Sequence, residues 1–159
     1  MIYTSNAFVL PLPSGHRFPM AKYARLAERV TRLAGPLMHV PDAATDAELL
    51  RAHDAGYVDA VSRGMLDERA LRRIGFPWSP AMVERSRRSA GATLAACRSA
   101  LGRGVGINLA GGTHHAHRAH GEGFCVFNDA AVAARAMQAE GLARRVLVVD
   151  LDVHQGDGT

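Results

Sequence analysis

The chain is poor in residues and segments that define several classes of protein. It has two cysteines in 159 residues, Cys97 and Cys125. They are too few for a disulfide framework and too far apart for a zinc ribbon, so we expect a protein of a reducing compartment, the cytoplasm. The sequence contains no run of about 18 apolar residues, so it predicts no membrane-spanning helix. The first 18 residues lack the basic region and the long apolar stretch of a signal peptide.

Lysine is also scarce, because Lys22 is the only one, and the net charge of +4 is carried by arginine. The densest basic group is Arg85, Arg87 and Arg88, which we interpret as a solvated helix face. A nucleic-acid partner would require a basic stripe together with an element that reads a groove, and no such motif is present. We therefore expect no direct nucleic-acid partner and no membrane partner.

The overall composition is that of a globular protein, with 48% hydrophobic and 21% charged residues. A chain of this length can form one domain with a sizeable core, which we place at residues 1–159. Apolar spacing and capping signals predict helices at 20–33, 46–52, 56–63, 80–101 and 129–140. Residues 65–75 are expected to form a loop or a short helix. Short apolar runs predict strands at 2–3, 105–109 and 145–151.

The order of these elements from residue 80 onward indicates the fold class. It is helix, strand, loop, helix, strand, which contains a β-α-β unit and favours an α/β fold with a mainly parallel sheet. The last strand, Arg145–Leu151, is dominated by valine and leucine. Such a composition is typical of a strand that is buried on both faces of a parallel sheet.

A group of polar side chains follows this last predicted strand. Asp150, Asp152 and His154 are spaced at i, i+2 and i+4, so on an extended strand they point to one side. Ligands of open α/β sheets bind beyond the carboxyl ends of the strands. A carboxylate and an imidazole are a plausible part of a zinc site, which needs three protein ligands when it is catalytic. A polar strand end with a capping aspartate is the alternative.

Two adjacent histidines follow the preceding predicted strand. His114 and His115 come directly after Gly111-Gly112-Thr113, at what should be the same edge of the sheet. A histidine base needs a partner on its second nitrogen to fix its tautomer, and Asp150 and Asp157 could supply two carboxylates. The pattern predicts two histidine–aspartate dyads. Metal ligation or simple surface exposure of the histidines are the alternatives.

A glycine-rich segment with an aromatic residue lies between these two groups. In residues 121–129, Gly123 precedes Phe124, which could line an apolar channel close to exposed backbone. A core phenylalanine before a helix is the alternative interpretation.

Several segments, taken in order, resemble the histone deacetylase family. The start of the chain and residues 53–61 look like the class IV and related bacterial members. The segments are PLPSGHRFPMAKY at 11–23, HDAGYVDAV at 53–61, GGTHHA at 111–116, GEGFCVFND at 121–129 and RVLVVDLDVHQGDGT at 145–159. The resemblance implies the arginase–deacetylase fold, a three-layer α/β structure with helices on both faces of a mainly parallel sheet.

The resemblance also implies roles for single residues. Asp152 and His154 look like two of the three zinc ligands, and His114 and His115 look like the tandem active-site histidines, oriented by Asp150 and Asp157 respectively. The backbone around Asp150, Asp152 and His154 resembles a structural site for a monovalent cation such as K⁺.

Further roles follow for residues outside the strand end. Gly123 and Phe124 would shape the tunnel for the acylated lysine, and Arg17 matches an arginine near the inner acetate-release cavity. His117 and His120 match no functional position, and we expect them to be solvated.

The implied activity is zinc-dependent hydrolysis of an acyl-lysine in a protein, or of a small acylated amine. In the family, the third zinc ligand and a catalytic tyrosine lie beyond the position of Thr159. We therefore expect the N-terminal half of a deacetylase domain, inactive or incomplete alone. Two alternatives stay open: an arginase-type manganese hydrolase, and a non-catalytic, degenerate deacetylase-like binding domain.

Overall fold

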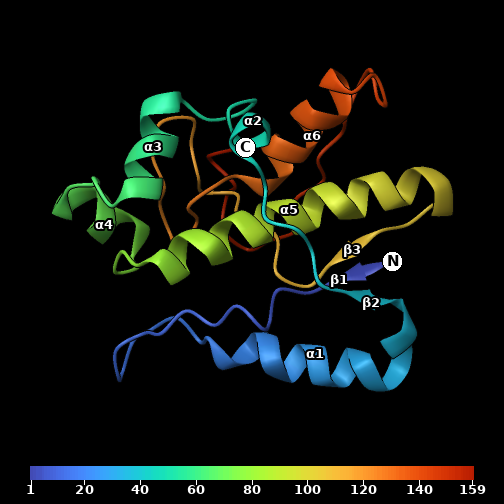
Figure 1. Ribbon diagram of the computed structural model, residues 1–159, viewed down its shortest axis with the longest axis horizontal. Coiled ribbons are helices and arrows are strands. Elements are labelled where there is room, and N and C mark those ends of the chain that lie inside the picture. The colour runs from blue at the N-terminus through green and yellow to red at the C-terminus, as the bar shows by residue number, and fades with distance from the viewer.

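A small parallel sheet lies at the centre of the computed structural model, which describes all residues from 1 to 159. The central strand β1 (Ile2–Tyr3) pairs with β2 (Met38–His39) on one side and with β3 (Ile107–Asn108) on the other. Helix α1 (Ala21–Ala34) lies on one side of these strands, and α5 (Pro80–Arg103) lies on the other (Figure 1). The predicted α/β architecture with a parallel sheet is confirmed.

The helices occur close to where the sequence predicts them. Residues 65–75, expected to form a loop or a short helix, contain a seven-residue helix. None of the helices is both long enough and apolar enough to cross a membrane. Besides α1 and α5 they are the 3₁₀ helix η1 (Gly35–Leu37), α2 (Asp46–Leu49), α3 (Ala55–Arg63), α4 (Glu68–Ile74) and α6 (Asp129–Ala139).

Side-chain caps fix the starts of four of these helices, α2, α4, α5 and α6. Thr45 and Glu48 form the predicted capping box, in which Thr45 N–H donates to Glu48 Oε2 at 2.9 Å and Glu48 N–H donates to Thr45 Oγ1 at 3.3 Å. Ser79 Oγ accepts from the backbone N–H of Met82 at 3.1 Å, and Asn128 Oδ1 accepts from that of Ala131 at 2.9 Å. These bonds satisfy N–H groups that have no partner within the helix.

The core forms where α5 packs against α6 and the segments around them, and it holds 17 buried residues.

One close approach in this region involves the backbone of α5 itself. A Cβ atom at Gly91, in the buried middle of α5, would lie 2.0 Å from the carbonyl oxygen of Asp42. Only glycine therefore permits α5 to pack against the segment at residues 42–44.

The predicted strand at Arg145–Leu151 is wrong. The segment has no strand pairing, and its apolar side chains are exposed, Leu147 to 85% and Leu151 to 91%. The apolar run predicts burial, but β3 ends the hydrogen-bonded sheet and no helix covers the segment. Only Ile107–Asn108 of the predicted strand at 105–109 is paired, and Ile107 is 43% exposed rather than buried.

The interpretation of the arginine group as a solvated helix face is wrong for Arg85. This residue is buried, and its guanidinium donates to the carbonyl oxygens of Phe8 at 3.0 Å and Ser5 at 3.5 Å. Its charge lies 4.1 Å from the centre of the Tyr23 ring. Arg85 therefore ties the N-terminal segment to α5, and the backbone carbonyls and the ring compensate for the lost hydration of its charge.

Candidate active site

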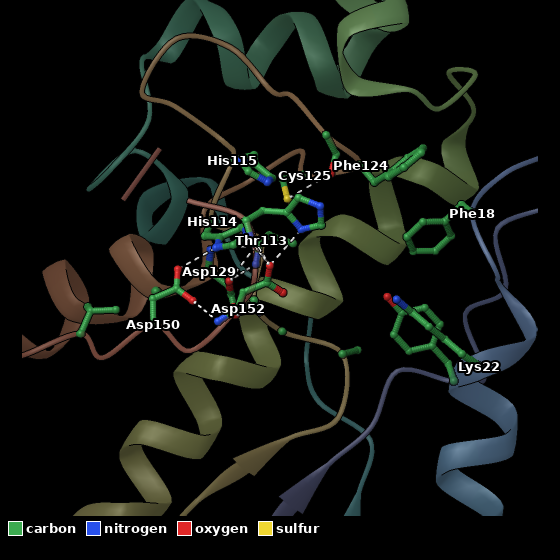
Figure 2. A pocket seen from close by; sticks show the side chains of 18 of the residues that line it. Phe18, Lys22, Thr113, His114, His115, Phe124, Cys125, Asp129, Asp150 and Asp152 are labelled. Atoms are coloured by element: carbon green, nitrogen blue, oxygen red, sulfur yellow. Dashed lines mark hydrogen bonds and ion pairs between the residues drawn. The ribbon is translucent and has the colours of Figure 1, made fainter. Parts of the chain in front are cut away.

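A cavity of about 660 Å³ brings together the chemical groups that the sequence singled out. Its walls come from the N-terminal segment, from the loop after β3, from residues 123–125 and from residues 148–154. In Figure 2, Phe18 and Lys22 face Asp150 and Asp152 across this space, and His114 and His115 lie on the same side as the two aspartates.

The imidazoles of two histidine–aspartate pairs line the pocket. His114 Nδ1 lies 2.7 Å from Asp150 Oδ2, and His115 Nδ1 lies 2.8 Å from Asp157 Oδ1. The centres of the two imidazole rings are 4.3 Å apart. The structure thus brings together the four side chains of the predicted dyads, while their catalytic roles stay predictions.

The hydrogen bonds of the two pairs determine which ring nitrogen of each histidine can accept a proton. The hydrogen bond from His114 lowers the pKa of Asp150, and the hydrogen bond from His115 lowers the pKa of Asp157. Both carboxylates are therefore ionised at neutral pH and only accept hydrogen bonds. Each neutral imidazole consequently carries its hydrogen on Nδ1, which leaves Nε2 as a proton acceptor.

Asp152 and His154 lie side by side next to the dyads. Asp152 Oδ1 accepts from the backbone N–H of His154 at 2.7 Å and lies 3.0 Å from His154 Nδ1. The backbone hydrogen bond from His154 is the main cause that lowers the pKa of Asp152. Asp152 N–H in turn donates to Asp150 Oδ1 at 3.0 Å. These side-chain-to-backbone bonds, rather than a strand, bring the three side chains together.

The spacing of Asp152 and His154 is compatible with a shared metal ion. Two ligands that each bind zinc at about 2.0–2.1 Å lie roughly 3.3 Å apart in a tetrahedral site. The 3.0 Å between Oδ1 and Nδ1 is close to this value. No third imidazole, thiolate or carboxylate completes a three-ligand group around these two residues. They fit two of the three ligands that a catalytic zinc requires.

Gly123 and Phe124 form a turn that presents the aromatic ring. Both have positive φ angles, 54° and 67°, and their N–H groups donate to the carbonyl oxygens of Arg73 and Ile74 at 3.2 and 2.7 Å. The Phe124 ring packs 5.1 Å from that of Phe18. Arg17 is exposed and lies over Phe124 at 5.9 Å, and it is not among the residues that line the pocket.

Asp129 is a positioning residue that the sequence reasoning missed. Its buried carboxylate accepts from the backbone N–H groups of Gly112 and Thr113, at 3.1 and 2.8 Å, and from the hydroxyls of Thr113 and Thr93, at 2.7 and 2.5 Å. It therefore holds the loop that carries His114 and His115. The only signal in the sequence is an acidic residue in the first turn of a helix, which indicates a favourable dipole interaction.

The sequence predicts that His117 and His120 are solvated, but the structure buries each of them in part. Both are half-buried, and their rings stack with centres 4.4 Å apart and an angle of 16° between the planes. They lie on the loop between His115 and Phe124.

The model of the histone deacetylase domain family matches residues 16–159. The chain belongs to this family. The match favours the deacetylase family over the arginase-type manganese hydrolases.

Individual relatives agree with this assignment. An uncharacterized protein of Picosynechococcus sp. is 45% identical over 156 residues, which cover 96% of this chain and 52% of that protein. The acetoin utilization protein AcuC of Staphylococcus aureus is 36% identical over 129 residues, which cover 75% of this chain and 33% of AcuC.

A solved structure confirms the fold. The crystal structure of a histone deacetylase homologue from Aquifex aeolicus superposes with a TM-score of 0.78 at 24% identity. The match covers 99% of this chain and 45% of that structure. This chain therefore spans about half the length, or less, of these relatives.

Proposed function

We propose that this chain supplies the histidine-bearing part of the active site of a zinc-dependent deacylase, which hydrolyses the amide of an acyl-lysine or of a small acylated amine. The observation that carries the proposal is the pair of dyads, His114–Asp150 at 2.7 Å and His115–Asp157 at 2.8 Å, which open on one pocket. Two adjacent imidazoles provide both halves of the proton transfer that amide hydrolysis needs.

The proposed role of the dyads is general acid–base catalysis. One imidazole accepts, at Nε2, a proton from the water that attacks the acyl carbonyl. A histidine in its protonated form then donates a proton to the lysine nitrogen as the C–N bond breaks, so that the products are a carboxylic acid and an amine. Asp150 and Asp157 keep the rings in the required tautomer and stabilise the imidazolium. Such proton transfers contribute roughly 10²–10⁴-fold to a rate.

The proposed metal ligands are Asp152 and His154, joined by a third ligand from outside this pair. A bound Zn²⁺ would supply Lewis-acid polarisation of the acyl carbonyl. The ionised state of Asp152 supports this role because its negative charge favours a divalent cation. A monovalent cation such as K⁺, held by the backbone around Asp150, Asp152 and His154, is a further proposal that depends on the family resemblance.

The proposed substrate position is the aromatic side of the pocket. The ring of Phe124, supported by Phe18, provides an apolar wall for the methylene chain of a lysine. Gly123 has no side chain to cover its backbone beside His115. A Cβ atom at this position would lie 2.9 Å from the ring of His115. An acylated chain could therefore pass between the aromatic wall and the imidazoles.

A fluorogenic acetyl-lysine assay with added Zn²⁺ tests the proposal. It should compare this chain with a longer version that extends over the full length of the relatives. We expect turnover by the longer version, reduced by His115→Gln and by His114→Gln, and at most weak turnover by the 159-residue chain. Equal activity of the two chains would show that Asp152 and His154 need no further ligand. Full activity of both histidine variants would exclude the acid–base role.

A non-catalytic binding domain is the second candidate, and the presence of only two ligands at Asp152 and His154 favours it. It predicts that the 159-residue chain binds an acetyl-lysine peptide without hydrolysing it. It also predicts that the longer version binds without turnover. Fluorescence anisotropy with a labelled peptide, run beside the activity assay, separates the two candidates.

A further inference from the structure

One group of three possible metal ligands lies outside the proposed catalytic residues. His117, His120 and Glu122 each offer one ligand atom, and these three atoms all lie within 4.8 Å of one another. In the whole chain this is the one group in which three such side chains converge. The backbone N–H of His117 donates to the carbonyl oxygen of His120 at 2.8 Å, which closes the loop and sets the two rings face to face.

The start of this loop is anchored to buried structure. His53 is buried, and its Nδ1 lies 3.0 Å from the carbonyl oxygen of His117 and 3.3 Å from that of Arg118. Its Nε2 accepts from the backbone N–H of Asn128 at 3.0 Å. Because Nε2 is an acceptor, Nδ1 carries the hydrogen and donates it to the loop. The ring of His53 therefore fixes the backbone on which the ring of His117 is mounted.

The end of the loop is fixed as well. Glu122 and Cys125 exchange two backbone hydrogen bonds, at 3.0 and 2.8 Å. The backbone N–H of Asp54 donates to the carbonyl oxygen of Arg118 at 3.0 Å, and Arg118 pairs with the Asp54 carboxylate at 2.6 Å. The cluster is thus held in place by hydrogen bonds that do not involve its ligand atoms. Those atoms remain available to an ion, and the backbone that carries them needs little ordering when the ion binds.

The chemistry of the donors indicates the class of ion. Two imidazoles and a carboxylate suit Zn²⁺ and similar divalent transition metals, whereas Ca²⁺ and Mg²⁺ prefer sites made of oxygen.

A fourth ligand is close to this cluster. Asp157 Oδ2 lies 3.7 Å from His117 Nε2, while its other oxygen, Oδ1, faces His115. His120 Nε2 lies 3.9 Å from Glu122 Oε2. Both separations exceed by about half an ångström the roughly 3.3 Å expected between two ligands of a tetrahedral zinc. Asp157 is outside the group of three whose ligand atoms lie within 4.8 Å of one another, so its side chain and the two stacked imidazoles would have to rotate toward a bound ion.

We propose that His117, His120 and Glu122 form a second site for a divalent transition-metal ion of the zinc class, with Asp157 as its fourth ligand. The site is separate from the pair Asp152 and His154 and does not depend on the proposed function. Asp157 connects it to the pocket, because the same carboxylate accepts the hydrogen bond of His115. An ion at this site draws Asp157 Oδ2 toward itself and thereby changes the environment of the His115 ring.

Calorimetric titration with Zn²⁺, together with the visible absorption of bound Co²⁺, tests the proposal on the 159-residue chain. The double variant Asp152→Ala/His154→Ala removes the other candidate ligands, which are exposed and outside the core. We expect this variant to bind one Zn²⁺ and to show the intense visible bands of tetrahedral Co²⁺. Adding His117→Gln and His120→Gln should weaken binding by more than the roughly 10–100-fold that follows loss of an outer-shell partner.

His39→Gln is the matched control, since it removes an exposed imidazole from β2 and should leave the titration unchanged. Circular dichroism verifies that each variant is folded. Nuclear magnetic resonance of the imidazole nitrogens should show the His115 signals moving when Zn²⁺ is added to the Asp152→Ala/His154→Ala variant. The proposal is overturned if this variant binds no Zn²⁺, or if the His117/His120 substitutions leave its affinity unchanged.

Discussion

Asp129, in the first turn of α6, accepts hydrogen bonds from both the backbone N–H and the hydroxyl of Thr113, at 2.8 and 2.7 Å. Thr113 in turn accepts from the backbone N–H of Asp129 at 3.1 Å. The residue directly before the tandem histidines is thereby joined to the start of α6. The position of both imidazoles consequently depends on a carboxylate that does not contact them.

Replacing this carboxylate tests that dependence. Asp129→Asn keeps the shape of the side chain but replaces an acceptor oxygen with a donor group, which faces other donors. We expect the free energy of unfolding to fall by about 1–3 kcal/mol, the usual cost of an unsatisfied buried polar group. Urea unfolding measures it. Glu68→Gln, in the exposed first turn of α4, is the control and should change stability by less than about 0.5 kcal/mol.

Gly123 provides a test of the packing beside His115. At a φ of 54°, Gly123→Ala carries the left-handed strain of about 1–2 kcal/mol, and its Cβ atom would also lie 2.9 Å from His115 Cδ2. Gly141→Ala is the matched control, because its φ of 71° imposes the same strain with no atom within 4 Å. We expect Gly123→Ala to be the less stable variant in thermal unfolding. It alone should shift the nuclear magnetic resonance signals of His115; identical behaviour of both variants would contradict the close contact.

An ion-pair network between α5 and the end of α6 predicts that the stability of the fold depends on pH. Hydrogen bonds from Arg98 and Arg51 lower the pKa of Glu140 to about 2. A carboxylate with a lowered folded pKa stabilises the fold above its ordinary value of 4.5, and this contribution is lost as the pH falls toward 2. Glu140→Gln should therefore be less stable than the parent chain above about pH 4.5, and the difference should shrink below it.

The measurement is urea unfolding at several pH values. The difference at neutral pH should be about 1 kcal/mol or less, since the pairs are partly exposed to solvent. Glu28→Gln removes a largely exposed pair within α1 and serves as the control. A Glu140→Gln effect that is the same at pH 3 and pH 7 would refute an ionic origin.

The exposed segment at residues 145–151 gives a direct test of the corrected strand prediction. Leu151→Ser replaces a side chain that is 91% exposed, so we expect the stability to change by less than about 0.5 kcal/mol. Solubility should increase, because contiguous exposed apolar surface promotes association. Val132→Ser, in the buried face of α6, is the contrasting control and should be strongly destabilising. A loss of several kcal/mol from Leu151→Ser would indicate that the segment is buried after all.

The helices were predictable from the sequence because their determinants are local. Thr45, Ser79 and Asn128 have the side chains that cap helices, and each caps the helix that follows it. The contacts of His114 and His115 were also anticipated, although the reasoning relied on a strand that is absent. Bonds between side chains and backbone at residues 150–154 produce the same grouping without it.

The remaining features depend on partners that are distant in the sequence. Arg85 binds carbonyl groups 77 and 80 residues away, so its burial cannot be inferred from its own helix. The strand β2 has only two residues, which is too short for any periodicity. Asp129 follows a capping asparagine and is acidic in a first turn, a pattern that many helices share without contacting a loop. In each case the deciding interaction is tertiary.

The two glycines within α5 are under opposite constraints. At position 91 any side chain would collide with the Asp42 carbonyl, whereas a methyl group at Gly102 would meet no atom within 4 Å. Saturation mutagenesis should therefore return glycine alone at position 91 and nearly every residue at position 102. Alanine at position 102 should raise the free energy of unfolding, by less than the roughly 0.8–1.0 kcal/mol that separates alanine from glycine in a helix interior, because the position lies in the last turn of α5. A helix-stabilising substitution in α5 is therefore possible near its C-terminal end, at position 102, and not in its middle, at position 91.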